Sequence, residues 1–116
     1  MDNATHAEMM GRVRRNADLF TALRLLGNIS DDPETKCWNW QRTTTNGYGR
    51  IRVDGKLLTS HRVAYQLWKN KLRPGYEIDH LCYNRACCNP AHLEQVLLIV
   101  NKLRQTFPAT RPQVPA

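Results

Sequence analysis

Residues 79–93 hold most of the reactive side chains of this chain and constrain its fold more than any other stretch. They include two histidines, three of the four cysteines and an Asn-Pro turn. Cys82, Cys87 and His92 follow one another at intervals of five residues, which allows thiolates and an imidazole to share one zinc ion. Cys37, the cysteine outside the stretch, is the natural fourth ligand. We therefore expect these four residues to form a closed, structural zinc site.

Two other interpretations of the cysteines are less favourable. Cys88 competes for the fourth position, but it adjoins Cys87, and neighbouring side chains point in different directions. Disulfides would require export, and the polar start of the sequence is not typical of a secretory signal. No window approaches the ~20 apolar residues that cross a membrane. We therefore expect a cytoplasmic protein, with no membrane partner, whose reduced thiols bind metal.

Length and charge narrow the class of protein further. A chain of 116 residues has room for one small domain and a short appendage, and a domain of this size gains from an internal metal staple. Seventeen Lys+Arg against ten Asp+Glu give a formal charge of +7. That balance favours a polyanionic partner, most simply DNA.

The first part of the chain predicts a helix over residues 7–26. Apolar residues recur there at spacings of three and four, namely at Met10, Val13, Ala17, Phe20 and Leu23. This stripe either packs on the domain or pairs with a second copy of the chain, giving a homodimer. A third option is a DNA-contacting arm that uses the arginines of residues 12–15. Residues 28–36 are polar and are expected to form a linker.

A β-hairpin is predicted next. After a loop at residues 43–47, apolar and polar residues alternate over Tyr48–Val53, which is typical of a strand with one buried face. Asp54-Gly55 favours a two-residue hairpin turn, and Lys56–Thr59 return as the second strand. The outward face of the first strand is the candidate DNA-contacting surface. Its residues are Tyr48, Arg50 and Arg52.

The remaining elements lead into and out of residues 79–93. Ser60 is a suitable N-cap for a helix. The inner stripe of that helix is formed by Val63, Ala64, Leu67 and Trp68. Tyr76–His80 alternates like a strand, and residues 96–100 favour a short helix but would also suit a strand. We expect an N-terminal helix and linker (1–35), a compact domain (36–104) and a disordered, proline-rich tail (105–116).

His80 is left over when the zinc ligands are assigned. A structural zinc site has no use for an imidazole two residues before Cys82, its first ligand in this stretch. A hydrolytic site needs such an imidazole, because a neutral imidazole near pH 7 can accept a proton from water. His80 therefore favours a hydrolytic centre beside the zinc.

The order of these residues resembles the HNH endonuclease family, and within it the proteins with a zinc-pinned finger, similar to His-Cys box homing endonucleases. The matching pattern is Asp79-His80-x-Cys82-x4-Cys87-x-Asn89-Pro90-x-His92-Leu93, followed by Asn101. Upstream, Cys37-Trp38-x-Trp40, Gly47-Tyr48-Gly49-Arg50 and Ser60-His61-Arg62 are similar to small phage-type members. The resemblance covers residues 37–104.

This resemblance implies an α+β, ββα-metal fold that hydrolyses DNA phosphodiester bonds. It implies that His80 is the general base, that Asn101 and Asp79 bind Mg²⁺ or another divalent cation, and that Asn89 holds the finger loop in shape. An Asn at position 101 departs from the more common His, but an amide oxygen remains a suitable Mg²⁺ ligand. Arg62 is a further candidate for steadying the cleaved phosphate.

Two other functions stay open. A non-catalytic zinc-stabilised module that binds nucleic acid would need the four zinc ligands but neither His80 nor Asn101. RNA cleavage or a toxin-like role would use the same centre, because both nucleic acids present a phosphodiester backbone.

Overall fold

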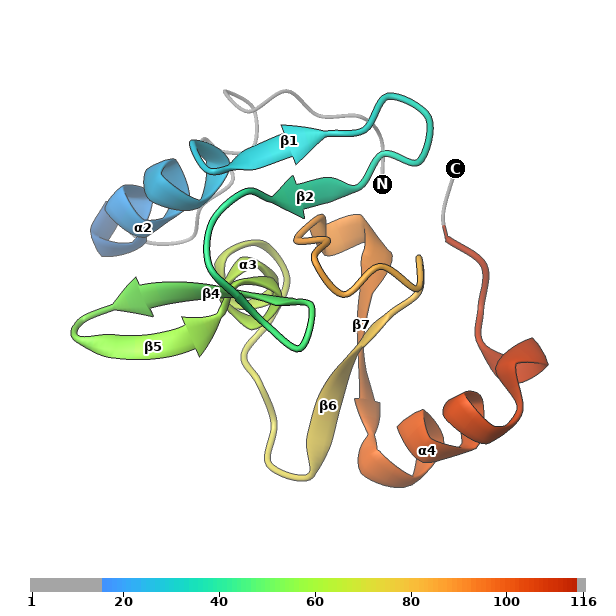
Figure 1. Cartoon of the computed structure of the whole chain (residues 1–116). Coiled ribbons are helices and arrows are strands. Elements are labelled where there is room, and N and C mark those ends of the chain that lie inside the picture. The colour runs from blue at the N-terminus through green and yellow to red at the C-terminus, as the bar shows by residue number, and fades with distance from the viewer. Residues whose placement is uncertain (1–15, 115–116) are drawn as a thin grey trace.

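The structure is a computed structural model that describes residues 16–114 (Figure 1). Its strands form three small antiparallel sheets, with strand orders β1-β2, β3-β4-β5 and β6-β7. The elements in order are α2 (Asn16–Leu26), β1 (Ile29–Asp31), β2 (Trp38–Trp40), β3 (Thr44–Thr45), β4 (Tyr48–Val53), β5 (Lys56–Thr59), α3 (Ser60–Trp68), β6 (Tyr76–His80), the 3-10 helix η1 (Pro90–His92), β7 (Leu93–Leu97), α4 (Leu98–Thr106) and the 3-10 helix η2 (Pro108–Thr110). The fold is mixed α+β, as predicted.

The central hairpin has the predicted strands and turn. Val53 pairs with Lys56, and Asp54 and Gly55 both have positive φ, as a tight two-residue hairpin turn requires. Thr44–Thr45, expected as loop, instead pair with β4 as a short third strand. A Cβ at Gly49 would lie 2.7 Å from a ring carbon of Trp40 and 2.9 Å from Ser60 Oγ. This glycine therefore lets β4 lie directly against β2 and the start of α3.

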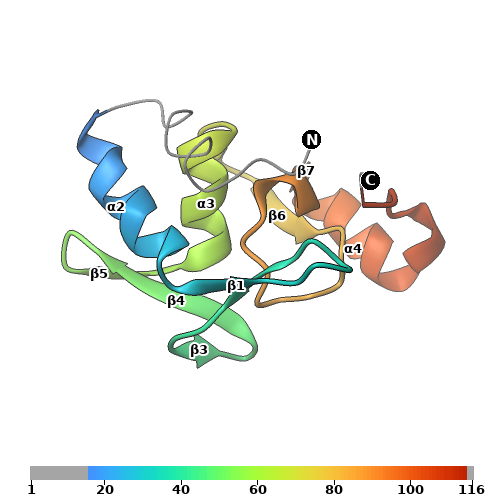
Figure 2. The same ribbon diagram turned by 90° about the horizontal axis from the view of Figure 1, so that it is seen from above.

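The N-terminal helix packs through a different face from the predicted one. Ala22, Leu25 and Leu26 are buried in the main core, whereas Phe20 and Leu23 are 73% and 60% exposed. The predicted stripe is therefore wrong at these two positions. Two apolar faces lie side by side on this helix, and contact with α3 selects the second one (Figure 2). Met10 and Val13 lie outside the described residues.

The expected linker contains a strand. Ile29–Asp31 pair with Trp38–Trp40, so the prediction of a polar linker over residues 28–36 is wrong for these residues. The β1 strand is held because partly buried Ile29 packs against the core that also contains α2 and both tryptophans of β2. Whether residues 1–35 form a unit separable from 36–104 stays a prediction.

The second half of the chain is a hairpin followed by a helix. Strand β6 covers the predicted residues and pairs with β7 along its whole length, from Tyr76↔Leu97 to His80↔Leu93. The ambiguous stretch 96–100 divides between the end of β7 and the start of α4. Helix α4 packs on both strands. No helix among residues 16–114 is long and apolar enough to span a membrane.

The start of α3 and the C-terminal tail differ from the predictions. Thr59 takes the N-cap position of α3, and Ser60 is the first helical residue, because β5 runs into the helix without a loop. The tail, expected to be disordered, continues α4 to Thr106, forms η2 and reaches Arg111, whose Nε lies 2.9 Å from Asp79 Oδ2. The expectation of disorder is therefore wrong for residues 105–111, since an ion pair and a 3-10 turn hold them to the domain.

Candidate functional site

Strand β2 and the loop after β6 bring the four predicted zinc ligands together. The backbone of β2 binds this loop at two points: Trp40 N donates to Ala86 O (3.0 Å) and Cys88 N donates to Trp38 O (2.8 Å). Cys37, directly before β2, is thereby carried to the loop that holds Cys82 and Cys87. His92 ends the following 3-10 helix. A residue 45 positions upstream of Cys82 thus completes the cluster through backbone pairing.

The geometry of this cluster fits a tetrahedral metal. The ligand atoms of Cys37, Cys82, Cys87 and His92 all lie within 4.8 Å of one another. Nδ1 of His92 is 3.5 Å from the sulfurs of Cys37 and Cys87. A tetrahedral zinc with ordinary Zn–S and Zn–N bonds would separate sulfur from nitrogen by about 3.6 Å. The donor set therefore fits a metal such as zinc, with no open position for water.

The thiols of the cluster also favour a cation electrostatically. A hydrogen bond with Cys87 lowers the pKa of Cys82 to about 4, and the same interaction raises the pKa of Cys87. Burial raises the pKa of Cys37. One thiolate thus forms readily and opposes ionisation of the other two sulfurs. A bound cation removes this repulsion and allows all three to ionise.

Cys88 and Asn89 have other roles in this loop. Cys88 is 1% exposed, belongs to the hydrophobic core and has its pKa raised to about 12 by burial, so it behaves as a small apolar side chain. Asn89 Oδ1 accepts a hydrogen bond from Ala91 N, and its Nδ2 donates to Lys36 O (2.7 Å). The Asn89 side chain therefore ties the finger loop to the residue before Cys37.

A second cluster forms around His80, at the end of β6. The ring centroid of His80 is 4.5 Å from that of His61, at the start of α3, and 5.9 Å from that of Tyr48 on β4. His61 and Tyr48 lie 5.5 Å apart. Three segments of the predicted nuclease region thus meet at His80. The sequence did not decide the role of His61, although Ser60-His61-Arg62 is one of the segments that resemble small phage-type HNH proteins.

The environment of His80 sets its protonation. Its Nε2 lies 3.2 Å from Cys87 O, and because a carbonyl only accepts, Nε2 carries the hydrogen. Nδ1 then keeps its lone pair, and no hydrogen bond to it is found among the described residues. Burial lowers the pKa of His80, which keeps the ring neutral near pH 7. This tautomer can accept a proton through Nδ1.

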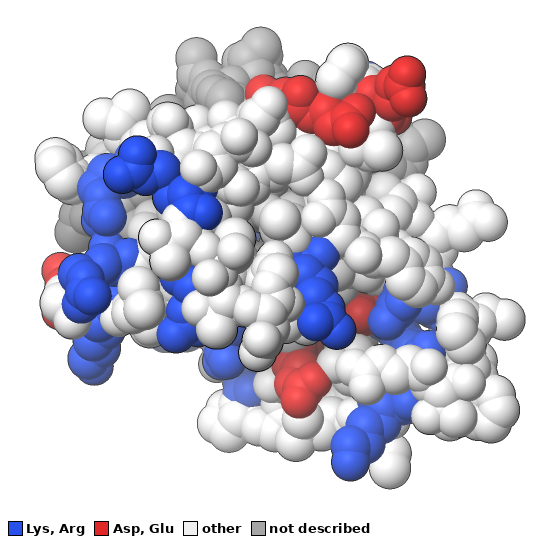
Figure 3. Space-filling model, viewed as in Figure 1, with Lys and Arg blue, Asp and Glu red and all other residues white. Residues whose placement is uncertain are grey.

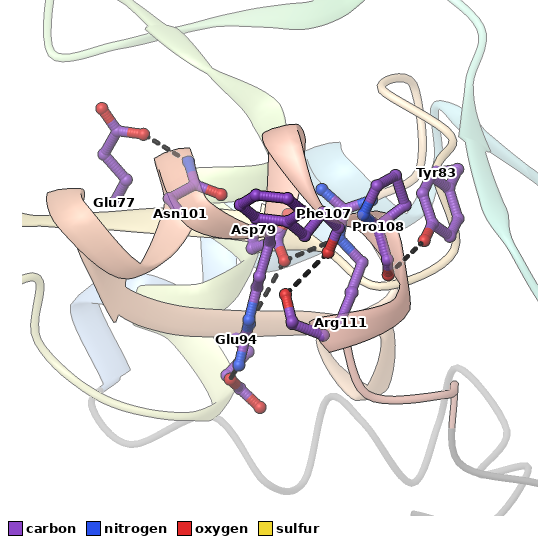
Figure 4. Close-up of polar contacts among 10 residues, drawn as sticks. Glu77, Asp79, Tyr83, Glu94, Asn101, Phe107, Pro108 and Arg111 are labelled. Atoms are coloured by element: carbon purple, nitrogen blue, oxygen red, sulfur yellow. Dashed lines mark hydrogen bonds and ion pairs between the residues drawn. The ribbon is translucent and has the colours of Figure 1, made fainter.

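The predicted magnesium ligands lie on the opposite face of β6, which packs against α4 (Figure 4). Adjacent strand residues point to opposite faces, so Asp79 faces away from His80. Asp79 Oδ2 accepts from Arg104 Nη1 (3.2 Å) and Arg111 Nε (2.9 Å). Arg104 also pairs with Glu94. The structure therefore does not bring Asp79 into the histidine cluster.

Asn101, the other predicted magnesium ligand, lies on the same α4 side as Asp79. Its Nδ2 donates to Glu77, and its Oδ1 is buried without a hydrogen-bond partner (Figure 4). An unpartnered amide oxygen fits a hard cation, whereas the two guanidinium groups on Asp79 do not. The residues present thus fit a divalent cation in part. Sequence reasoning missed Arg104 and Arg111, because an ion-pair partner carries no local sequence signal.

The predicted DNA-contacting residues are distributed over two places. Tyr48 is half-buried, packs on the histidines and lies beneath Arg85, whose Cζ is 5.1 Å from the ring centroid. Arg50 and Arg52 continue along β4 away from this cluster. Arg62 is exposed on α3, next to His61. In Figure 3, basic side chains gather where Figure 1 shows β4 and β5, and acidic ones gather over the β1–β2 connection.

Comparison with known proteins finds a family similarity in the sequence. Residues 59–96, which contain His61, His80 and three of the four cluster residues, match the HNH endonuclease family. This stretch is similar to HNH endonucleases and is called the HNH segment. No solved structure matches the chain.

The chain is also similar to phage proteins. The chain is 42% identical over 60 residues to Protein 2.8 of Escherichia phage T7, covering 49% of the chain and 40% of that protein. It is 50% identical over 55 residues to the uncharacterized gene 5.3 protein of Enterobacteria phage T3, covering 42% of the chain and 54% of that protein. Protein 7.7 of Escherichia phage T7 is 38% identical over 58 residues. The alignments span about half the length of these relatives.

Proposed function

We propose that the chain is a metal-dependent HNH endonuclease that hydrolyses DNA phosphodiester bonds. The observation that carries the proposal is the state of His80 within the HNH segment: buried, neutral, with Nε2 held by Cys87 O and the Nδ1 lone pair available. An imidazole fixed in one tautomer by a backbone acceptor is prepared to take a proton at the other nitrogen.

The chain's own residues supply the steps around the scissile phosphate. His80 Nδ1 removes a proton from water, the resulting hydroxide attacks phosphorus, and the bond to the leaving oxygen breaks. The leaving oxygen then takes up a proton from solvent water and departs as a hydroxyl group. His61 and Tyr48 pack on the His80 ring and hold its orientation. Arg62, exposed beside them, is positioned to approach the phosphate.

The proposal includes two metals, one structural and one catalytic. A zinc ion at Cys37, Cys82, Cys87 and His92 would hold the loop that carries the Cys87 carbonyl, and so would act on His80 indirectly. Asn101 and Asp79 would hold Mg²⁺ or another divalent cation, which, when bound, neutralises charge that develops on the phosphate. Both arginines bind Oδ2 of Asp79, so Oδ1 would have to hold the cation against the repulsion of two guanidinium groups.

This repulsion supports a second candidate function. A non-catalytic, zinc-stabilised module that binds nucleic acid needs only the cysteine–histidine cluster and the basic surface. The engagement of Asp79 by Arg104 and Arg111 favours this alternative, because their positive charges oppose a cation at Asp79.

Plasmid nicking separates the two functions. The protein is incubated with supercoiled DNA and Mg²⁺, with and without EDTA, alongside a His80→Ala variant purified in the same way. The nuclease proposal expects nicking that EDTA abolishes and that is strongly reduced in the variant. DNA binding without nicking under any divalent cation would establish the binding module instead.

The setting of the activity follows from the same proposal. Matches to phage proteins support action in the cytoplasm of an infected prokaryotic cell. A homodimer through the N-terminal helix also stays a proposal, supported by the exposed Phe20 and Leu23 on α2.

A further inference from the structure

Four arginines line one hollow at the end of β4 that lies away from His80. Arg50 and Arg52 come from β4, Arg24 from the last turn of α2, and Arg42 from the chain after β2. The hollow has a volume of about 340 Å³. Asn28, Trp40 and Ile51 complete its wall. Three segments of the chain thus direct basic residues to one place, which we call the arginine hollow.

The positive charge of the arginine hollow is not neutralised within the described protein. Among residues 16–114, none of the four guanidinium groups forms an ion pair with a carboxylate; the ion pairs there involve Arg104 and Arg111. Like charges held together at a concave surface repel one another, and an anion removes that repulsion. The electrostatics therefore favour an anionic ligand.

Most hydrogen-bond donors of the hollow are also unused. Arg24 Nη1 donates to Arg52 O (2.8 Å), and Arg52 Nη1 donates to Gly55 O (3.1 Å). These bonds brace the two side chains but occupy one nitrogen of each guanidinium group. Arg50 Nε is buried and has no partner. A guanidinium group offers planar, paired donors that match two oxygens of a phosphate.

We infer that the arginine hollow binds a backbone phosphate of the nucleic acid, distinct from the phosphate that is cleaved. The inference rests on the proposed function, which supplies the nucleic acid, and it adds Arg24 and Arg42 to the contact surface. Arg50 and Arg52 lie on the same side of β4 as Tyr48, which packs on His80. At ~3.3 Å per strand residue, Arg52 lies roughly 13 Å from Tyr48 along the strand. The two sites thus hold different phosphates of one backbone that follows β4.

The test is DNA binding in EDTA, so that it does not depend on cleavage. A short fluorescein-labelled duplex is titrated with wild type, with Arg24→Ala/Arg42→Ala, and with the matched control Arg73→Ala/Lys102→Ala. The control removes the same charge from exposed positions outside the hollow. Each phosphate contact contributes about 0.9 to the slope of log affinity against log salt. We expect the hollow variant to lose about one unit of slope and the control to keep the wild-type slope.

Uncharged phosphates then locate the contact. A series of duplexes carries one methylphosphonate each, at successive positions. One position should weaken wild-type binding several-fold yet leave the hollow variant unaffected, because that variant has already lost the contact. The inference is overturned if every position weakens both proteins equally, or if the hollow variant keeps the wild-type salt slope.

A second variant serves as a control for misfolding. Arg24 braces β4, so its loss could disturb the hairpin, whereas no hydrogen bond of the Arg42 side chain is found among the described residues. Arg42→Glu alone should lower affinity further than Arg42→Ala at unchanged melting temperature. Equal affinity of the two Arg42 variants would also overturn the inference. Normal binding with no plasmid nicking would instead reject the nuclease proposal and leave the hollow in place.

Discussion

The two candidate metal regions flank the same hairpin, yet they are prepared very differently. At the cysteine–histidine cluster, four ligand atoms already lie within 4.8 Å of one another, and within residues 16–114 no Lys, Arg, Asp or Glu side chain is hydrogen-bonded to them. On the α4 side, Asp79 is held by two arginines and Asn101 by Glu77. A metal at the cluster completes the fold, whereas a metal at the α4 face must bind beside two guanidinium groups that repel it. The first arrangement suits a structural ion that is always bound. The second suits an ion that is bound only under some conditions.

The largest expected effect is the loss of a zinc ligand. Cys82→Ser or Cys37→Ser should release the metal and unfold the domain, because zinc in small finger peptides contributes on the order of 10 kcal/mol, about the total stability of a small domain. Cys88→Ala, at a buried position beside the cluster, is the matched control and should retain one zinc per chain with a modest fall in melting temperature. Zinc content by atomic absorption and far-UV circular dichroism check both. Retention of zinc by Cys37→Ser, with loss of zinc in Cys88→Ala, would contradict the ligand assignment.

The second effect concerns catalysis without loss of the fold. His80→Ala should reduce plasmid nicking by about 10²–10⁴-fold, which is the usual contribution of a positioned general base. Zinc content and DNA affinity should change little, since His80 is outside the metal cluster. Nicking rates and DNA affinity are measured on the same preparation. Full activity in this variant would exclude His80 as the base.

The third effect tests whether the arginines on Asp79 weaken metal binding at the α4 face. Arg111→Gln removes one of the two cations on Asp79 and should lower the Mg²⁺ concentration for half-maximal nicking roughly fivefold, the equivalent of about 1 kcal/mol for a partly shielded ion pair. Asn101→Ala should shift this concentration in the opposite direction, because a metal ligand is lost. Arg73→Gln, an exposed arginine elsewhere, is the control. An unchanged Mg²⁺ requirement in Arg111→Gln would indicate that Asp79 does not bind the catalytic metal.

The difference between the two regions also explains how far the sequence could predict them. The spacing of Cys82, Cys87 and His92 predicted the cluster because a short loop constrains where its ligands can lie. Cys37 could be added because few cysteines remained. Strand alternation, read at Glu77 and Asp79, would have placed both carboxylates on the face opposite His80. Their partners Arg104 and Arg111 could not be predicted, because they arrive from a helix and a tail whose packing is non-local.

The N-terminal helix shows the same limit. Its periodicity was compatible with two neighbouring apolar faces, and only the contact with α3 decides that Ala22, Leu25 and Leu26 are buried. The hairpin of β4 and β5 needed no such information, because Asp54-Gly55 and the alternation on either side are local signals. Local chemistry was therefore predictable, and the choice between equivalent surfaces was not.

The smallest expected effect distinguishes the acid sensitivity of the histidine cluster from that of the zinc cluster. Burial, with a smaller contribution from neighbouring His80, lowers the pKa of His61 to about 3, whereas an unfolded histidine has its ordinary pKa of about 6.5. Below pH 6.5 the unfolded state therefore binds a proton that the folded state excludes. Stability falls as the pH falls through this window and continues to fall toward the folded pKa. At pH 6 the cost is about 1 kcal/mol, which is small enough to leave the zinc cluster intact.

His61→Gln removes this titration while keeping a polar side chain of similar reach at the start of α3. Urea denaturation of wild type and variant is compared at pH 7.5 and pH 6, with zinc content measured at both. The variant should lose about 1 kcal/mol less than wild type between the two pH values, whatever its absolute stability. Acid loss of zinc affects both proteins alike and cancels in this difference. Identical pH dependence of the two proteins would mean that His61 is already protonated or solvated in the folded state, and the His61–His80 contact would then not be the dry, neutral pair that holds the general base.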